Sequence, residues 1–309
     1  MKVFILYAKE NWITDVLVKE WIQNNKDIYT NNLDEADIVW ILSNYIARRI
    51  PNYKYKTKKV ITTIHHITPW KVDFVQKKHF DYLNEITDIF HTNSLKTTLE
   101  MKKYFNKPIK TIPLWHNEKL WTFLNKKTEL RKKYNFDGFL IGSFQRDTEG
   151  ASIKNGTFKP KLEKGPDIFI ENIKSLQNIY NNIKVLLTGT RRQYIIKELK
   201  NNNIDYYYHQ MCDLKTLNEF YNCLDLYIVS SRVEGGPRAI NECSLTKTPL
   251  FSTNVGISNL LCYPESIFDI YEPSTILNCK TNIEYNFNNA QKYTIQNYME
   301  KFTNLLFNK

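Results

Sequence analysis

The chain has 309 residues, of which 42% are hydrophobic, and it carries a formal net charge of +11 at pH 7. That length holds two domains with a core each, and no window approaches the roughly 18 apolar residues of a membrane span. The five cysteines are odd in number and show no metal-ligand spacing. They indicate reduced thiols in a cytosolic protein rather than a disulfide framework.

The positive charge is concentrated in the first part of the chain. Residues 1–137 contain 24 Lys and Arg against 15 Asp and Glu, whereas residues 138–309 contain 19 against 17. One interpretation is a basic surface that meets an anionic partner. The other is a general abundance of Lys, Asn, Ile and Tyr, as an AT-rich coding sequence produces, and the composition leaves both open.

In the first half, short apolar runs alternate with helical patterns. The run at 3–7 is too short for a signal peptide and is interrupted by Lys9 and Glu10, so we expect a first strand there. Apolar spacing predicts helices over 15–23 and 95–104. Further strands are expected at 38–42, 60–64, 89–92 and 110–113.

The same alternation continues from Gly138, the first glycine of the chain, and it is typical of α/β folds with parallel sheets. Asp213 is a good N-cap for a helix through Tyr221. The charged segment 117–135 is expected to be helical and to connect two sheets, and an amphipathic helix is expected over 290–307. Strands are predicted at 139–143, 184–188, 205–208, 225–229, 250–253 and 267–270.

The most informative segment begins at Ser230 and reads Ser-Ser-Arg-Val-Glu-Gly-Gly-Pro-Arg-Ala-Ile-Asn-Glu, directly after an apolar run that predicts a buried strand. Pro237 suits the first position of a helix, and the two glycines before it leave the loop without bulky side chains. The N–H groups at such a helix start can hold an anion. Glu234 lies beside this loop, and Glu242 lies about one and a half turns into the helix. A phosphate-bearing ligand with hydroxyls at both ends fits this layout.

This segment, together with Cys243 and the later apolar strand at 248–256, resembles the signature of GT-B glycosyltransferases, in particular the retaining family 4 group (glycosyltransferase group 1). The resemblance extends more weakly over nearly the whole chain. It implies two Rossmann-like domains with parallel sheets that face each other across a cleft. Residues 1–135 would form the acceptor domain, 136–289 the nucleotide-sugar donor domain, and 290–309 a helix that packs back on the N-terminal domain.

The resemblance also implies roles for single residues. Glu234 would contact hydroxyls of the donor sugar, and Glu242 would accept hydrogen bonds from the ribose. The helix start from Gly235 through Gly236 and Pro237 to Arg238 would lie against the sugar and the diphosphate. Two cations after the first strand of this half would clamp that diphosphate, and Arg146 and Lys164 are the candidates, with Lys161 as an alternative to Lys164. This chain carries an insertion between the two cations, so they lie further apart in the sequence than they do in the family.

Other positions are less specific. Gly189 ends a strand at the level where the family binds the nucleotide, whereas Arg191 and Arg192 are expected in a solvated loop. The strand at 60–64 is followed directly by histidine, as is a strand of the family whose histidine lies near the reacting centre. His65 is the match, and His66 is the alternative. The glycine-rich loop that the family has after its first strand is absent, since residues 7–12 read Tyr-Ala-Lys-Glu-Asn-Trp. No role is assigned to His79, His91, His116 and His209.

We therefore expect a glycosyltransferase of the hexosyltransferase type. It would move a sugar from a nucleoside-diphosphate donor to an acceptor with retention and without a metal or other cofactor, in polysaccharide or glycolipid synthesis. The acceptor is expected to be an anionic or lipid-linked saccharide, and the protein a cytoplasmic one whose basic half can contact a membrane. The alternative is a non-catalytic basic protein that binds nucleic acid or an anionic membrane. No Gly-x-Gly-x-x-Gly after a strand, phosphate loop or Asp-x-Asp occurs, which disfavours dinucleotide oxidoreductases, NTPases and metal-dependent glycosyltransferases.

Overall fold

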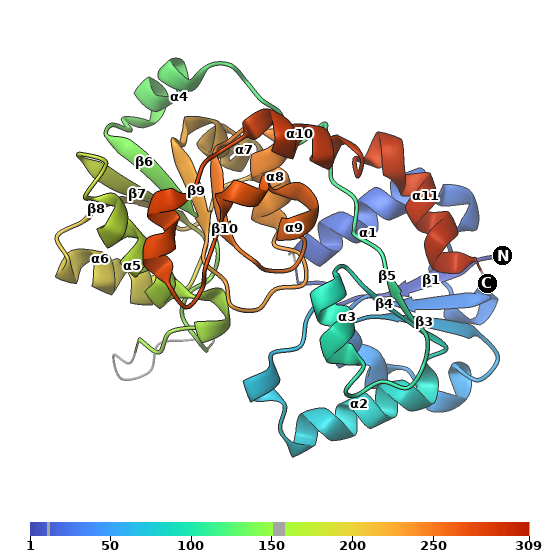
Figure 1. The fold of residues 1–309 in the computed structure, drawn as a ribbon. Helices are drawn as coiled ribbons and strands as arrows, with labels where there is room; N and C mark the ends of the chain where they lie inside the picture. Colours follow the sequence, from blue (N-terminus) through green and yellow to red (C-terminus); the bar gives the residue numbers. More distant parts are fainter. Residues whose placement is uncertain (11–12, 151–157, 309) are drawn as a thin grey trace. The chain divides into compact units, whose positions relative to one another are not determined.

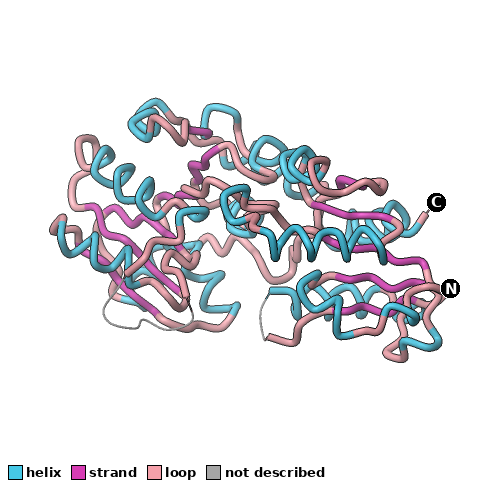
Figure 2. The backbone as a smooth tube through the Cα atoms, turned by 90° about the horizontal axis from the view of Figure 1, so that it is seen from below, coloured by secondary structure: helices cyan, strands magenta, loops and turns pink. Residues whose placement is uncertain are grey.

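The computed structural model describes residues 1–10, 13–150 and 158–308. The chain divides into two compact units, one made of Met1–Leu114 with Tyr298–Lys309, the other of Trp115–Asn297 (Figure 1). Each unit is an α/β structure built on one parallel sheet, as the sequence predicts. Helices flank the strands of each sheet (Figure 2).

The sheet of the first unit has five described strands in the order β1-β2-β3-β4-β5, all parallel. Each strand therefore lies beside the next one along the chain. Its elements are β1 (Val3–Leu6), α1 (Ile13–Asn24), β2 (Ile38–Ile41), β3 (Lys59–Thr63), α2 (Phe74–Ile86), β4 (Ile89–Thr92), α3 (Leu95–Met101), β5 (Ile109–Thr111) and, from the end of the chain, α11 (Ile295–Phe307).

Both faces of this first sheet are covered, since β2 is buried at all four positions. Val39 and Ile41 face a cluster that contains residues of α2 and α3. Side chains alternate along a strand, and Trp40 on the other face packs against aromatic rings from both ends of the chain. Its ring centroid lies 5.9 Å from that of Trp21 in α1 and 5.8 Å from that of Phe302 in α11.

A chain of neutral hydrogen bonds runs through the interior of this unit. The indole Nε1 of Trp40 donates to the Thr63 hydroxyl over 2.9 Å, and that hydroxyl lies 3.0 Å from Nδ1 of His91. The other ring nitrogen of His91 lies 2.8 Å from the carbonyl oxygen of Ile112. Burial lowers the pKa of His91 to about 4, so this ring is neutral and fully bonded at neutral pH.

The sheet of the second unit has six described strands in the order β11-β10-β9-β6-β7-β8. The chain runs outward from β6 on one side and then returns to place β9 on the other. The elements are α4 (Lys127–Tyr134), β6 (Phe139–Ser143), α5 (Pro166–Leu176), β7 (Ile183–Thr188), α6 (Gln193–Asn201), β8 (Asp205–His209), α7 (Leu214–Cys223), β9 (Leu226–Val229), α8 (Arg238–Leu245), β10 (Leu250–Thr253), α9 (Ser258–Leu261), β11 (Ile267–Phe268) and α10 (Ile283–Gln291).

Residues 115–135 pack on this second unit, whereas the sequence placed the domain boundary at 135. The backbone N–H of Thr122 donates to the side chain of Asn218 over 3.0 Å, and that of Leu124 donates to Asn222 over 2.8 Å. Arg131 bonds the carbonyl oxygen of Cys223 over 2.9 Å. These bonds join the segment to α7, which is why the compact units divide at Leu114 and Trp115.

All eleven predicted strands are present, and Asp213 caps α7 by accepting from the N–H of Thr216. The expected helix over 290–307 is instead two helices, α10 and α11, because the chain between them leaves helical geometry to pair Thr294 with His116 in a parallel bridge. The five cysteines are unpaired, and three of them are buried. Within the residues described here, no helix combines the length and apolar character needed to cross a membrane.

Candidate functional site

The candidate site lies where the strand order of the second sheet reverses, between β6 and β9. Strand β6 pairs with β7 on one side and with β9 on the other. In doubly wound sheets the loops that leave the carboxyl ends of two such strands separate toward opposite faces, and the crevice between them binds ligands. The loops here are the residues after Ser143 and the Ser230–Pro237 segment that the sequence singled out.

Two glycines bring neighbouring loops against that segment. Gly165 precedes α5 with φ +58, and a Cβ atom at this position would lie 1.9 Å from the carbonyl oxygen of Ser230. Gly256, with φ +54, would place a Cβ 2.9 Å from both the carbonyl oxygen of Gly235 and Cδ of Pro237. Only glycine allows both the backbone conformation and the close approach, so these two positions set the shape of the site.

Lys164 and Glu234, 70 residues apart in the sequence, form an ion pair that joins the segment before α5 to the Ser230–Pro237 loop. Gln145 supports the pair, since its amide donates to the carbonyl oxygen of Lys164 over 2.9 Å and accepts from the Ser231 hydroxyl over 3.1 Å. The Ser230 hydroxyl donates to the same Lys164 carbonyl oxygen over 3.2 Å. The structure thus brings together one predicted carboxylate and one predicted cation.

Lys161, the alternative cation, is paired elsewhere. Its Nζ lies 3.5 Å from Oε1 of Glu163, a buried carboxylate. Arg146 lies half-buried in the loop after β6. The insertion between the two proposed cations includes residues 151–157, which lie outside the described part of the chain, as do Asn11 and Trp12 of the loop after the first strand.

Glu242 lies in the second turn of α8, and only 7% of it is exposed. The hydroxyl of Tyr221 donates to its Oε2 over 2.6 Å. Burial raises the pKa of this carboxyl, while the charge of Arg238 and the Tyr221 hydroxyl act in the opposite direction. Pro237 is the residue before α8 rather than its first, since its ψ of 115° is not helical. The helix therefore presents the N–H groups that follow Pro237.

One expectation for this region is wrong: Arg192 is not in a solvated loop but is completely buried. Its Nε donates to the carboxylate of Asp147 over 2.5 Å, and its Nη1 donates to the carbonyl oxygens of Ser143 and Thr188 over 2.6 Å and 2.9 Å. Asp147 also accepts from the N–H of Ile195 in α6. This buried pair fixes the loop that carries Arg146 to the ends of β6 and β7.

The remaining predicted residues are distributed as follows. Gly189 follows β7 with φ +85, and its carbonyl oxygen accepts from the Tyr208 hydroxyl over 3.0 Å. His65 and His66 belong to the first unit, where they follow β3. The ring of His65 lies 3.0 Å from the carbonyl oxygen of Leu42, and burial lowers its pKa; His66 is exposed.

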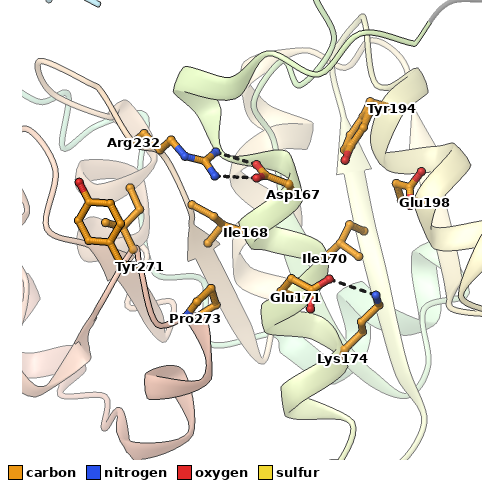
Figure 3. Close-up of a pocket in the computed structure, with 11 residues that line it drawn as sticks. Asp167, Ile168, Ile170, Glu171, Lys174, Tyr194, Glu198, Arg232, Tyr271 and Pro273 are labelled. Carbon is orange, nitrogen blue, oxygen red and sulfur yellow. Dashed lines mark hydrogen bonds and ion pairs between the residues drawn. The ribbon is translucent and has the colours of Figure 1, made fainter. Parts of the chain in front are cut away.

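A separate pocket of about 370 Å³ lies between α5, α6 and the loop after β11, and neither Lys164 nor Glu234 lines it. Figure 3 shows Arg232 and Asp167 joined by two contacts at one end of this pocket and Tyr271 at its side. The two Arg232–Asp167 bonds measure 2.7 Å and 2.6 Å. They anchor the residue two positions before Glu234 to the first turn of α5, so this pair stiffens the loop of the candidate site.

Comparison with known proteins supports the resemblance seen in the sequence. Residues 155–266 match the family model described as Glycosyl transferases group 1, a range that includes Lys164, Glu234 and Glu242. A search of curated proteins found no match. This range is a glycosyltransferase group 1 domain.

Solved structures show the same fold over nearly the whole chain. HepE from Anabaena, solved with UDP and glucose, has 12% identity and a TM-score of 0.77, with 99% of each chain covered. Sucrose-phosphate synthase from Thermosynechococcus elongatus has 12% identity and a TM-score of 0.67, with 97% of this chain and 79% of that one covered. TarM from S. aureus has 15% identity, a TM-score of 0.63 and coverages of 94% and 59%. The chain therefore has the GT-B fold.

Proposed function

We propose that the chain is a glycosyltransferase that binds a nucleoside-diphosphate sugar on its second unit, with UDP-sugars as the first candidates. The observation that carries this proposal is the Lys164–Glu234 pair at the reversal of the strand order, beside the start of α8. The group 1 domain and the UDP complexes of HepE support the class of donor.

The partner of Lys164 is expected to differ between the ligand-free protein and the protein with bound donor. Without a ligand, Lys164 neutralises Glu234. When a donor binds, its diphosphate competes for the ammonium group, and the carboxylate becomes available to accept from sugar hydroxyls. Arg146, Lys164 and the N–H groups at the start of α8 then neutralise the departing diphosphate, which makes a metal ion unnecessary.

We further propose that transfer proceeds with retention of the anomeric configuration and without a carboxylate nucleophile. The leaving phosphate takes the proton of the acceptor hydroxyl on the face of the sugar from which it departs. Glu242 holds the ribose, and His65 contacts the sugar. The acceptor is an anionic or lipid-linked saccharide, consistent with the excess of Lys and Arg in residues 1–137.

A thermal-shift screen against UDP-, GDP- and ADP-sugars tests the class of donor. A donor present at a hundred times its dissociation constant adds about 2.7 kcal/mol of stability. Turnover with the donor that binds should persist in EDTA, and NMR of the product should show the anomeric configuration of the donor. Stabilisation by nucleic acid and by none of these donors would instead favour the non-catalytic alternative.

The variant Glu234→Ala tests the site itself. Donor consumption should fall by about 100-fold, because a transition-state contact of this kind contributes two to three powers of ten. Glu171→Ala is the matched control, since Glu171 forms an exposed pair with Lys174 at 3.1 Å in the same unit and should retain full turnover. Unaltered turnover of Glu234→Ala would remove Glu234 from the mechanism.

A further inference from the structure

The pocket of about 370 Å³ in the second unit has the features of a binding site of its own (Figure 3). Helix α5 contributes Asp167 to its wall, and helix α6 contributes Tyr194 and Glu198. The segment after β11 contributes Tyr271. Ligand pockets in proteins measure roughly 300–1,000 Å³, so this one suits a small molecule or the end of a longer one.

Two tyrosines place aromatic rings at two sides of this pocket (Figure 3). Tyr194 precedes Glu198 by four residues, so both side chains lie on one face of α6. Tyr271 is 91% exposed, yet its backbone is held, since its N–H donates to the carboxylate of Asp269 over 2.7 Å. A large ring thus stands in solvent on a fixed backbone, which lowers the entropy that a ligand contact would cost.

Several polar groups of the pocket can still bond a ligand. Within the part of the chain that the structure describes, neither tyrosine hydroxyl has a hydrogen bond, and Glu198 has no cation within ion-pair distance. Glu198 accepts one long bond, 3.5 Å from the amide of Asn201. Burial and the nearby carboxylates, Glu198 first among them, raise the pKa of Tyr194. Its hydroxyl therefore keeps its proton and can both donate and accept.

The charges around the pocket favour a neutral ligand. Arg232 neutralises Asp167 through two bonds of 2.7 Å and 2.6 Å. Lys174 neutralises Glu171 over 3.1 Å. Glu198, which has no such partner, would repel an anion, whereas the guanidinium of Arg232 would repel a cation. A neutral ligand with many hydroxyls avoids both penalties, because each hydroxyl can donate to a carboxylate or accept from a cation.

We propose that this pocket binds a neutral saccharide, separately from the candidate site and without need of the transfer reaction. A sugar ring combines a face of C–H groups with a rim of hydroxyls. The C–H face packs on the exposed ring of Tyr271. The hydroxyls bond the Tyr194 hydroxyl and the Glu198 carboxylate. A single sugar unit, or the end of a longer saccharide, satisfies all of these groups together.

Binding of neutral and anionic oligosaccharides on a glycan array, by the full chain without nucleotide, tests the proposal. Calorimetry then measures Kd for the neutral glycan that binds most tightly. Tyr271→Ala should raise this Kd about 10-fold, because exposed tyrosines of this kind carry a large share of binding energy. Tyr271→Phe, which keeps the ring, should lose less. Neither variant should change Tm, since the side chain is 91% exposed.

A second variant tests the polar side of the pocket. Glu198→Ala should also raise Kd about 10-fold, because hydrogen bonds to a charged acceptor are the stronger ones. Tyr53→Ala is the matched control, since Tyr53 is 67% exposed, belongs to the first unit and does not line the pocket. It should leave the affinity for the glycan unchanged. All of these variants should bind a nucleotide sugar as the wild type does.

Three results would overturn the inference: no binding of any neutral glycan, tighter binding of anionic glycans than of neutral ones, or glycan binding that Tyr271→Ala and Glu198→Ala leave unchanged. In the last case the saccharide binds elsewhere on the chain. A chain that binds glycans through this pocket but binds no nucleotide sugar gives a different result, since it overturns the proposed function and supports this inference.

Discussion

The two parallel sheets of this chain differ in strand order, and the difference separates two ways of using polar residues. In the first unit consecutive strands are neighbours from β1 to β5, and the buried polar chain through Trp40, Thr63 and His91 completes its own hydrogen bonds. In the second unit the order reverses between β6 and β9, and charged pairs gather at the reversal. A parallel sheet thus leaves groups available for a ligand where its topology opens a crevice.

The largest expected effect concerns the buried charge in the second unit. Arg192→Met leaves the carboxylate of Asp147 buried without its partner and should lower the free energy of unfolding by about 3–5 kcal/mol. The double variant Arg192→Met/Asp147→Leu should recover most of this loss, because it removes both charges. Urea denaturation measures both. A loss below about 1 kcal/mol in the single variant would show that the pair does not hold the loop.

The next effect concerns the ion pair between Lys164 and Glu234. Lys164→Met and Glu234→Gln should each lower kcat about 100-fold. The double variant should lose much less than the product of the two, because residues that act as a unit are not additive. Steady-state assays of the wild type, the two single variants and the double variant give the coupling free energy between the two side chains. Fully multiplicative losses would show that the two side chains act independently, and the surface pair variants Lys174→Met and Glu171→Gln should be silent.

A smaller effect is expected in the first unit. His91→Leu removes a ring that bonds both the Thr63 hydroxyl and the carbonyl oxygen of Ile112, which should cost about 1–3 kcal/mol of stability. Donor affinity should not change. Thermal melting measures the loss of stability, and calorimetry measures the affinity for the donor. Weaker donor binding by His91→Leu would show that the interior of the first unit also acts on the donor site.

The last effect is a dependence of stability on pH. The folded pKa values of His91 and His116, about 4 and about 3, lie below the ordinary value of 6.5. Between these limits the unfolded chain binds more protons than the folded one, so stability is full above pH 6.5 and falls as the pH drops. Each histidine contributes at most about 1.4 kcal/mol per pH unit. Thermal melts from pH 7 to 5 measure the slope, which His91→Leu should reduce; an unchanged slope in that variant would contradict this assignment.

The fold was largely predictable because its signals are local. Runs of four or five residues marked every described strand, and Asp213 marked the start of α7. The pattern of Glu234 and Glu242 around two glycines predicted a strand, a loop and a helix in this order, and all three are present because they are continuous in sequence, whereas the roles of the two glutamates stay predictions. Arg146 and Lys164 came only from a family resemblance, and their roles stay predictions.

The parts that could not be predicted depend on contacts between distant residues. Arg192 was expected in solvent because its partner Asp147 lies 45 residues away and nothing near Arg192 signals burial. The burial of His116 was not foreseen either, since its neighbour Arg238 is more than a hundred residues further along. The boundary near residue 135 was misplaced for the same reason, because amide side chains of α7 hold the connecting segment.

The discontinuous first unit imposes an order on synthesis. Trp40 packs against Phe302 and Phe307, whose rings lie 5.8 Å and 6.1 Å from it, and both are synthesised after the whole second unit. The second unit is made of one uninterrupted stretch and can finish folding while translation continues. Residues 1–114 must therefore wait for the segment that begins at residue 298, and a nascent chain stalled before that residue would expose indole rings that a chaperone could hold.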